Sequence, residues 1–498
     1  MNDKRIRSIA ILGGGTAGWV AASMLARSMP GLGITVIESP DIGTIGVGEA
    51  TIPPITDFLR FLGINEADFI RNTQATFKLG IKFHDWHRIG QSYWHPFGTF
   101  GSTINRRPFH HYWLAARAKG WAPRFNDFSL CSALGDENRF QFPSTDSAIR
   151  YALHFDAGLV ARYLRSYSEH LGVKRLEKTV THADLAENGH ISGLHFSDGT
   201  RLAADLYIDC SGFRGVLIEQ TLKSGYLDWT HWLPCDRAVA FPTGIASPRP
   251  PYTSARARVA GWQWRIPLQH RTGNGHVYAG AHMSDQAALD DLLSTLGAAP
   301  LAEPRFLRFT AGRRKRFWIG NCVAIGLASG FLEPLESTSI HLAMSAIYNL
   351  LDHFPDRDFA PANIASYNDE LIAEIDHVRD FIILHYCATE RDDGELWRQV
   401  RRMELPDSLA ARIALYRESG RVRAKPGELF TDLSWFYIFD GMGIAPAATD
   451  PLTEVAGDQR LRSILGDLAG QNAEALKRAP SHDSYFSPSS KELAAPPA

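Results

Sequence analysis

Apolar and polar residues alternate strictly along TFKLGIKF, residues 76–83. A period of two predicts a β-strand with one buried and one exposed face. Lys78 and Lys82 both fall on the polar face of this strand. Because lysine side chains are mostly exposed in folded proteins, the pattern alone favours two solvated charges over a chemical role for either lysine.

Other stretches predict strands that alternate with helices. RSIAILGGGTAGWVAASMLARSM predicts a short apolar strand, a glycine-rich turn and a helix, and GITVIES predicts a second strand. Further along, LYIDCSGFRG predicts a strand and a tight turn. Residues 318–340 predict a strand, a loop and the start of a helix, with Ser337 or Thr338 as its N-cap. This order of elements predicts an α/β fold.

The first glycine cluster has the spacing of a dinucleotide-binding turn. Gly13, Gly15 and Gly18 stand at G-x-G-x-x-G spacing, and Glu38 ends the next strand twenty residues beyond Gly18. In such a turn the glycines allow a tight bend and close backbone approach to a pyrophosphate at the helix N-terminus, while the acid binds a ribose hydroxyl. The context predicts FAD or NAD(P), and the lack of a second such motif favours a single FAD.

Composition limits the remaining classes of function. The chain has 498 residues, of which 45% are hydrophobic and 21% charged, and its formal net charge is −2. This is typical of a globular protein with two or three domain-sized units, and it gives no reason to expect nucleic-acid or membrane binding. The five cysteines are scattered, without C-x-x-C pairs, so we expect no metal site and a cytoplasmic location.

Three more motifs carry a resemblance to a known family. GVGEATIP occupies residues 46–53, GWQWRIP has the pattern W-x-W-x-I-P, and FLEPLESTSI leads into the last predicted helix. Together with the glycine-rich turn and FKLGIKF, they resemble the flavin-dependent halogenases known as tryptophan halogenases. The resemblance spans residues 13–340 and implies a Rossmann-type, flavin monooxygenase-like FAD fold, with an added substrate region and a helical C-terminal part.

The resemblance also implies a reaction and the residues that perform it. A separate NAD(P)H-dependent flavin reductase would supply FADH2, and FADH2, oxygen and chloride or bromide would yield hypohalous acid. Lys78 would meet this acid by hydrogen bond or as a haloamine, and Glu336 would lie near Lys78 as its charge partner, which favours the hydrogen-bonding role. The implied FAD-binding residues are Gly13, Gly15, Ala17, Gly18, Glu38, Ala50, Gly326, Pro334 and Ile340. The implied halide-binding residues are Thr338 and Ser339, and the tunnel residues are Trp262, Trp264, Ile266 and Pro267.

The substrate is indicated by aromatic residues. His95 and Phe97 match the histidine and phenylalanine that sandwich the indole ring in the tryptophan enzymes, and Phe430 stands about where another aromatic residue would close over it. The tyrosine pair and following glutamate that hold the amino acid are missing from residues 421–443. Because buried charges need partners, we expect indole, an indole derivative or a tryptophan-containing molecule, with free tryptophan as the alternative.

The expected FAD domain is discontinuous. It comprises residues 1–55, 145–225 and 305–350, and the substrate region comprises 56–144, 226–304 and 351–480, followed by a flexible tail, 481–498. Two other functions remain open: an aromatic hydroxylase with the same FAD domain, and a non-catalytic FAD-binding family member. Lys78, Glu336 and the W-x-W-x-I-P motif argue against the hydroxylase, and Lys78 and Glu336 argue against the non-catalytic member. The pattern leaves the oligomeric state open.

Overall fold

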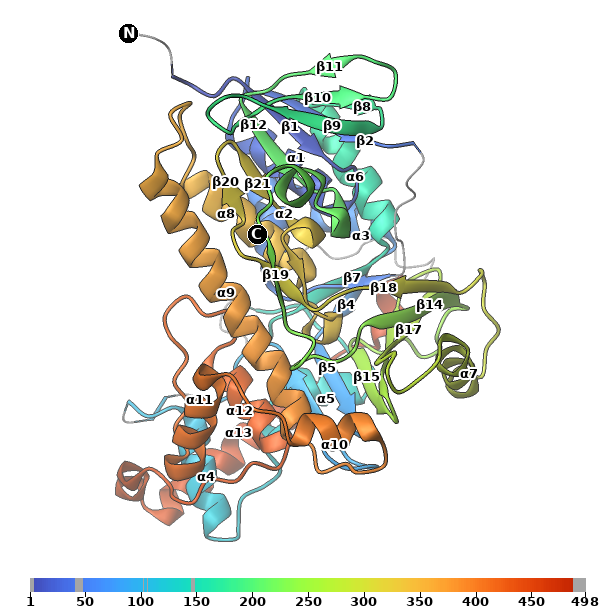
Figure 1. Cartoon of the computed structure of the whole chain (residues 1–498). Coiled ribbons are helices and arrows are strands. Elements are labelled where there is room, and N and C mark those ends of the chain that lie inside the picture. Colours follow the sequence, from blue (N-terminus) through green and yellow to red (C-terminus); the bar gives the residue numbers. More distant parts are fainter. Residues whose placement is uncertain (1–3, 41–47, 102, 105, 145–147, 487–498) are drawn as a thin grey trace. The chain divides into compact units, whose positions relative to one another are not determined.

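The computed structural model describes residues 4–40, 48–101, 103–104, 106–144 and 148–486 (Figure 1). The chain divides into two compact units, each assembled from three separate segments. Unit 1 comprises residues 1–74, 155–236 and 308–376, and unit 2 comprises residues 75–154, 237–307 and 377–498. The first segment of unit 1 continues to residue 74, whereas the first segment of the expected FAD domain ends at residue 55. The division into an FAD domain and a substrate region stays a prediction.

Unit 1 is built on a six-stranded sheet with the strand order β20-β21-β12-β1-β2-β8. All neighbouring strands are parallel except β20, which is antiparallel to β21. The strands are β1 (Ser8–Leu12), β2 (Gly33–Glu38), β8 (Lys174–Glu177), β12 (Leu206–Asp209), β20 (Trp318–Ile319) and β21 (Cys322–Ala324). This is the predicted α/β arrangement, because a parallel sheet needs crossover connections.

Side chains of β1 alternate between the two faces of this sheet, and a small antiparallel sheet covers one face while the helix that follows β1 contacts β1 and β2. Ala10 and Leu12 join a core cluster with Ile191, Leu194 and other residues of the small sheet. This small sheet consists of β9 (Val180–Leu185), β10 (Ile191–Phe196) and β11 (Arg201–Leu202). The helix after β1, α1 (Thr16–Ser28), packs against α6 (Ala157–His170) and α8 (Ser339–Asp352). Asp156 caps α6 as an N-cap residue, accepting hydrogen bonds from the Gly158 and Leu159 amides.

The other elements of unit 1 are short. Helices α2 (Pro54–Leu62) and α3 (Glu66–Thr73) follow the two-residue strand β3 (Glu49–Ala50). A further three-stranded sheet contains β13 (Tyr226–Asp228), β19 (Gly312–Arg314) and β22 (Gly330–Phe331). The described residues of the unit also contain four short turns, η2 (Gly212–Arg214), η3 (Val216–Thr221), η4 (Gly326–Ala328) and η5 (Pro334–Glu336).

Unit 2 contains a seven-stranded sheet in the order β18-β14-β17-β16-β15-β5-β6. The strands are β5 (Gly80–His84), β6 (Ser92–Pro96), β14 (Arg237–Thr243), β15 (Thr253–Arg258), β16 (Gly261–Pro267), β17 (Thr272–Tyr278) and β18 (Arg305–Arg308). Strand β5 runs parallel to β15 and antiparallel to β6. It therefore joins residues near position 80 to the strands that carry the W-x-W-x-I-P motif.

The stretch TFKLGIKF does not form the single half-buried strand that its alternation predicts. It breaks at Leu79 into β4 (Thr76–Lys78), which pairs with β7 (Ala152–Phe155), and β5 of the large sheet. All three residues of β4 are buried, and in β5 only Lys82 and His84 are partly exposed. The prediction of one exposed face was wrong because β4 is covered on both faces.

Three helices of unit 2, α5 (Leu130–Asp136), α7 (Asp285–Leu296) and α12 (Asp432–Gly441), pack directly against strands of the large sheet. Other helices along the chain are α4 (Phe109–Ala118), α10 (Glu395–Arg401), α11 (Asp407–Ser419) and α13 (Asp458–Arg478). The long helix α9 (Pro361–Cys387) has residues in both units. Among the described residues, no helix is long and apolar enough to cross a membrane.

The end of the described chain is packed. Residues 482–486 form the turn η7 (His482–Phe486), and the His482 side chain is fully buried. The backbone of Ser481 forms an isolated antiparallel β-bridge with that of Arg139. The expectation of a flexible tail from residue 481 is therefore wrong for residues 481–486; residues 487–498 lie outside the described part of the chain.

Candidate active site

The glycines of the predicted dinucleotide turn each meet a distinct local requirement. Gly13 has a φ of +123°, and a Cβ there would lie 2.1 Å from the Cys210 carbonyl oxygen. A Cβ on Gly18 would lie 1.8 Å from the Gly13 oxygen. Gly15 faces open space at the N-cap of α1. The turn is thus closed on its protein side and open at the helix N-terminus, where free amide groups favour an anion such as a pyrophosphate.

Two neighbours of this turn were missed by the sequence reasoning. Gly14 is also restricted, because a Cβ there would lie 2.0 Å from Glu38 Oε2; this contact is with a side chain, whereas Gly13 meets backbone atoms. Arg175 on β8 donates to Glu38 Oε1 through Nε at 2.7 Å. The run of three glycines, residues 13–15, could have indicated the role of Gly14. No local pattern in the sequence connects Glu38 with Arg175. Arg175 fixes the carboxylate at the carboxyl end of β2.

The other FAD-binding candidates also lie in unit 1. Gly326 begins η4, after β21, and a Cβ there would lie 2.7 Å from the Ala17 Cβ. Ile340 lies in the first turn of α8, and Pro334 begins η5. Ala50 lies in β3 beside Glu49, a half-buried carboxyl whose pKa burial raises to about 7. Of the motif at residues 46–53, Gly46 and Val47 are outside the described residues.

These residues fit the FAD that the family resemblance implies. Four side-chain-free positions in six residues leave room for a pyrophosphate against the open N-terminus of α1, and Glu38 stands at the end of the neighbouring strand. Gly326 follows the carboxyl end of another parallel strand of the same sheet. When bound, FADH2 would supply the two electrons that reduce oxygen in halide oxidation.

The proposed halide residues lie at the N-terminus of α8. The helix begins at Ser339 with Thr338 as its N-cap residue, although the Thr338 hydroxyl makes no cap hydrogen bond. Ser337, the other candidate N-cap, has a φ of +59° and ends η5. Ser339 is half-buried and Thr338 is buried. A helix N-terminus of this kind favours an anion, and its role as a halide site stays a prediction.

Glu336 and Lys78 lie in different units. Glu336 is fully buried at the end of η5, three residues before α8, so its carboxylate is close in sequence to the proposed halide residues. Lys78 is fully buried in β4 of unit 2. Burial of a charged side chain is costly unless it is compensated, which makes both residues unusual. Their pairing stays a prediction.

The two lysines of TFKLGIKF have different surroundings. Lys78 Nζ lies 5.1 Å from the centre of the Phe97 ring. Lys82 Nζ lies 2.6 Å from Asp136 Oδ1, and its side chain is 20% exposed. Lys82 thus has the ordinary ion pair of a lysine near the surface, whereas Lys78 is buried beside an aromatic ring.

The predicted substrate residues come together in unit 2. The Phe97 amide donates to the Leu79 carbonyl at 2.8 Å, which places Phe97 beside the Lys78 strand. The rings of His95 and Phe430 lie 5.9 Å apart. Phe381 of α9, which the sequence reasoning missed, stacks on Phe430 with ring centres 3.7 Å apart. Only the folded chain joins positions 95, 381 and 430, so no local motif could have revealed Phe381.

The W-x-W-x-I-P residues lie in β16. Trp262 and Trp264 are on the same face of the strand, with ring centres 6.0 Å apart, and Ile266 is buried. At the end of the strand, the Pro267 carbonyl accepts a hydrogen bond from the Thr76 hydroxyl at 2.6 Å. The motif is thus connected directly to β4, two residues before Lys78.

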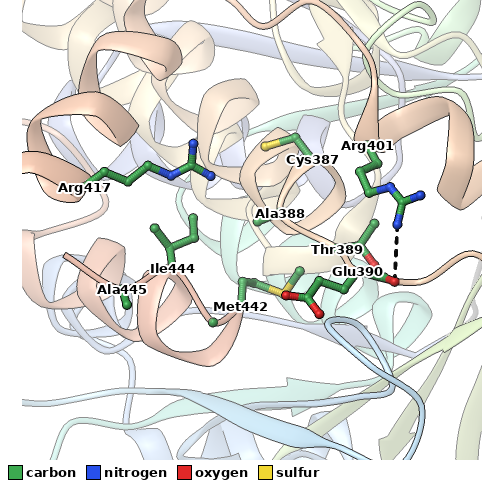
Figure 2. Close-up of a pocket in the computed structure, with 10 residues that line it drawn as sticks. Cys387, Ala388, Thr389, Glu390, Arg401, Arg417, Met442, Ile444 and Ala445 are labelled. Atoms are coloured by element: carbon green, nitrogen blue, oxygen red, sulfur yellow. Dashed lines mark hydrogen bonds between the residues drawn. The ribbon is translucent and has the colours of Figure 1, made fainter. Parts of the chain in front are cut away.

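A pocket of about 350 Å³ lies elsewhere in unit 2 (Figure 2). It is lined by Cys387, Ala388, Thr389, Glu390, Arg401, Arg417, Met442, Gly443, Ile444 and Ala445. In Figure 2, Arg401 reaches the Glu390 carbonyl, a contact of 3.5 Å. None of the predicted site residues lines this pocket.

One trio among the described residues has the composition of a metal site. His182, Asp184 and His195 lie on the small sheet of unit 1 and offer ligand atoms within 4.8 Å of one another. Asp184 Oδ2, however, already contacts His195 Nε2 at 2.5 Å and Arg201 Nε at 3.7 Å. The aspartate is thus neutralised by protein groups.

Comparison with known proteins gives one consistent family. The tryptophan halogenase family model matches residues 8–458. The tryptophan 7-halogenase RebH of Lentzea aerocolonigenes is 35% identical, over 90% of this chain and 91% of RebH.

Two solved flavin-dependent halogenases are similar over almost the whole chain. Xcc4156 from Xanthomonas campestris is 45% identical with a TM-score of 0.94, covering 97% of this chain and 98% of its own. BrvH from Brevundimonas sp. BAL3 is 43% identical with a TM-score of 0.94, covering 97% and 99%. These likenesses confirm the predicted Rossmann-type FAD fold and the predicted enzyme class. The chain therefore belongs to the tryptophan halogenase family of flavin-dependent halogenases.

Proposed function

We propose that this enzyme halogenates indole or an indole derivative, using chloride or bromide, oxygen and FADH2 from a separate NAD(P)H-dependent flavin reductase. The FAD-binding and halide-binding candidates lie in unit 1, and Lys78 lies in unit 2 with the aromatic candidates. A cytoplasmic location is part of the same proposal. The observation that carries the halogenation proposal is the complete burial of Lys78 beside Phe97.

The proposed chemistry at Lys78 is an electrophilic substitution. The ammonium group donates a hydrogen bond to the oxygen of hypohalous acid, which polarises the oxygen–halogen bond. The ring carbon takes the halogen, and the departing hydroxide takes a proton from the Lys78 ammonium group and leaves as water. The ring proton passes to the Glu336 carboxylate, and exchange with water restores the resting protonation of both side chains. A buried ammonium suits this step because a hydrogen bond strengthens when water is excluded.

The preference for indole over free tryptophan rests on the residues near Phe430. Glu428, two positions before Phe430, is a carboxylate that could hold an ammonium group, and its side chain is only 2% exposed. Arg412 donates to both Glu428 oxygens at 2.9 and 3.0 Å. The charge of Glu428 is therefore balanced within the protein. His95, Phe381 and Phe430 offer ring surfaces, which suit an uncharged aromatic substrate.

Free tryptophan is the second candidate. Relatives that are 34–37% identical are named tryptophan 6- or 7-halogenases, such as SttH of Streptomyces toxytricini. If Glu428 released Arg412 and paired instead with the ammonium group of tryptophan, the site would accept free tryptophan. The two candidates differ in whether Arg412 must release its partner.

A substrate competition distinguishes these candidates. Enzyme, FAD, a flavin reductase, NADH and oxygen are supplied with bromide or chloride and equal concentrations of indole, L-tryptophan and a tryptophan-containing peptide. Mass spectrometry then measures the halogen isotope doublet in each product. We expect indole to react with a kcat/KM at least about tenfold above that of tryptophan, a difference of about 1.4 kcal/mol.

The contrary results are equally specific. Preferred halogenation of tryptophan would overturn the indole assignment, and a hydroxylated product without halogen would overturn the halogenase proposal. Glu428→Gln is the matched variant: it should leave indole turnover within about twofold of wild type if the substrate makes no ionic contact there.

A further inference from the structure

The strand that carries Lys78 is short, and one of its edges has no neighbouring strand in the described part of the chain. β4 has three residues and pairs there with β7, through Thr76–His154, Phe77–Leu153 and Lys78–Ala152. Successive residues of a strand direct their amide groups to opposite edges. Phe77 is fully buried, so its amide needs a partner on the edge away from β7.

That partner is a histidine from the opposite end of the chain. The Phe77 amide donates to His482 Nε2 at 3.3 Å, across 405 positions of sequence. His482 Nδ1 lies 2.8 Å from the Arg249 carbonyl oxygen. Because Nε2 accepts a hydrogen bond, the ring proton must be on Nδ1, where it is donated to this carbonyl. The ring therefore acts as a neutral bridge between β4 and the segment before β15.

The surrounding contacts hold His482 in this position. Its amide donates to the Asn138 carbonyl at 2.9 Å, and the next residue, Asp483, forms an ion pair with Arg249 at 2.6 Å. Phe77 stacks on Phe140, and the Phe486 ring lies 5.7 Å from that of Phe77. Burial lowers the pKa of His482 to about 4, which keeps the ring neutral near pH 7.

A second neutral histidine supports the preceding residue of β4. The Thr76 hydroxyl gives its proton to Pro267, so it accepts from His154 Nδ1, at 3.2 Å. His154 Nε2 then accepts from the Thr253 hydroxyl at 2.9 Å. Burial and the Lys78 charge keep the pKa of His154 well below its usual range.

The residue after Lys78 is held as well. The Leu79 amide donates to the Pro251 carbonyl at 2.7 Å, and the Leu79 carbonyl accepts from the Phe97 amide. The backbone is thus fixed on both sides of Lys78. Of these contacts, the His482 hydrogen bond is the one that depends on the C-terminal segment.

We propose that His482 is a positioning residue for Lys78: its imidazole, acting as the outer-edge acceptor for Phe77, fixes β4 and with it the place of the Lys78 ammonium group. The inference rests on the proposed function, in which Lys78 contacts hypohalous acid. It makes residues 479–486 a required part of the halogenation site. Loss of the hydrogen bond leaves halide oxidation intact and lowers the share of oxidised halide that reaches the aromatic product.

Two substitutions separate this hydrogen bond from simple packing. His482→Gln can place an amide oxygen near the position of Nε2, so it keeps an acceptor for Phe77. His482→Asn can keep the donor to Arg249 but is too short to reach Phe77. His276→Asn is the control, because His276 is also a fully buried histidine of unit 2 that contacts a backbone carbonyl, that of Ala288 at 3.2 Å.

The full-length variants are compared with indole and bromide under saturating reductase. We expect His482→Asn to lower kcat for bromoindole formation at least about tenfold, with KM for indole within threefold of wild type. Release of hypobromous acid, measured with a β-diketone trap, should equal or exceed that of wild type. Exchange of the amide hydrogen of Phe77, followed by mass spectrometry, should accelerate at least about tenfold. His482→Gln and His276→Asn should stay within threefold of wild type in all measurements.

The failures of the two proposals are distinguishable. If wild type releases hypobromous acid and Lys78→Met stops product formation, the proposed function stands. Under that condition, His482→Asn activity equal to that of His276→Asn would overturn the role of His482. Equal losses in the Gln and Asn variants would also overturn it, because they would indicate packing rather than the Phe77 hydrogen bond. Full activity of Lys78→Met would overturn the proposed function itself.

Discussion

The glycine-rich turn of unit 1 and the Lys78 strand of unit 2 are built in different ways. The turn takes its shape from six consecutive residues, Gly13–Gly18, together with Glu38 at the end of β2 and Cys210 directly after β12. The Lys78 strand is fixed by residues near positions 97, 154, 251, 267 and 482. A candidate cofactor site of the first kind can be recognised from sequence, whereas a proposed reaction site of the second kind exists only after the distant segments have folded together.

The same difference explains what the sequence could predict. Strands β1 and β2, the turn and α1 followed from local periodicity and glycine spacing, and they were confirmed. The exposure of Lys78 was predicted wrongly from its alternating pattern, because alternation says nothing about what covers the second face. The resemblance, not the pattern, singled out Lys78 over Lys82. The partners Phe381 and His482 carried no local signal at all.

Among the effects on cofactor binding and on stability, the largest is expected in the turn. Gly18→Val should weaken FAD binding at least about 100-fold, equivalent to about 2.7 kcal/mol, because its Cβ would lie 1.8 Å from the Gly13 oxygen. Flavin fluorescence titration measures the change. Gly470→Ala is the control, since a Cβ there meets nothing within 4 Å and should not alter FAD affinity. Equal losses in both variants would refute the steric explanation.

The second effect concerns acid stability in unit 2. Burial lowers the pKa of His482 from 6.5 to about 4, so the unfolded chain binds a proton first and stability is lost as pH falls through this range. Between pH 7.5 and 5, wild type should lose about 2 kcal/mol more unfolding free energy than His482→Gln. Urea unfolding at both pH values measures the difference; identical losses would contradict a neutral His482.

The third effect has the opposite sign and lies in unit 1. Burial raises the pKa of Glu49 from 4.5 to about 7, so this group stabilises the fold below pH 4.5, and the contribution is lost as pH rises through 7. Because Glu49 is half-buried, we expect about 1–2 kcal/mol. Glu49→Gln should be more stable than wild type at pH 8 and nearly equal at pH 5. A constant difference at both pH values would rule out this titration.

The smallest effect is expected at Lys82. Lys82→Met removes the ion pair with Asp136 and the contact with the Trp94 ring, whose centre is 5.5 Å from Nζ. We expect about 1 kcal/mol lower unfolding free energy and halogenation within twofold of wild type. Thermal unfolding and product formation with indole measure the two quantities. A tenfold loss of halogenation with an intact fold would remove the distinction between the two lysines.

The most direct test of the central claim is the amount of haloindole that Lys78→Met makes compared with wild type and Lys82→Met. All three proteins are supplied with FADH2, oxygen, bromide, indole and an excess of the β-diketone trap, which removes hypobromous acid that is released into solution before it can brominate indole. FAD affinity and the brominated trap are measured for the same proteins. The account predicts at least about 1,000-fold less bromoindole from Lys78→Met, with FAD affinity unchanged and hypobromous acid still released. Bromoindole formation by Lys78→Met at the rate of Lys82→Met would contradict it.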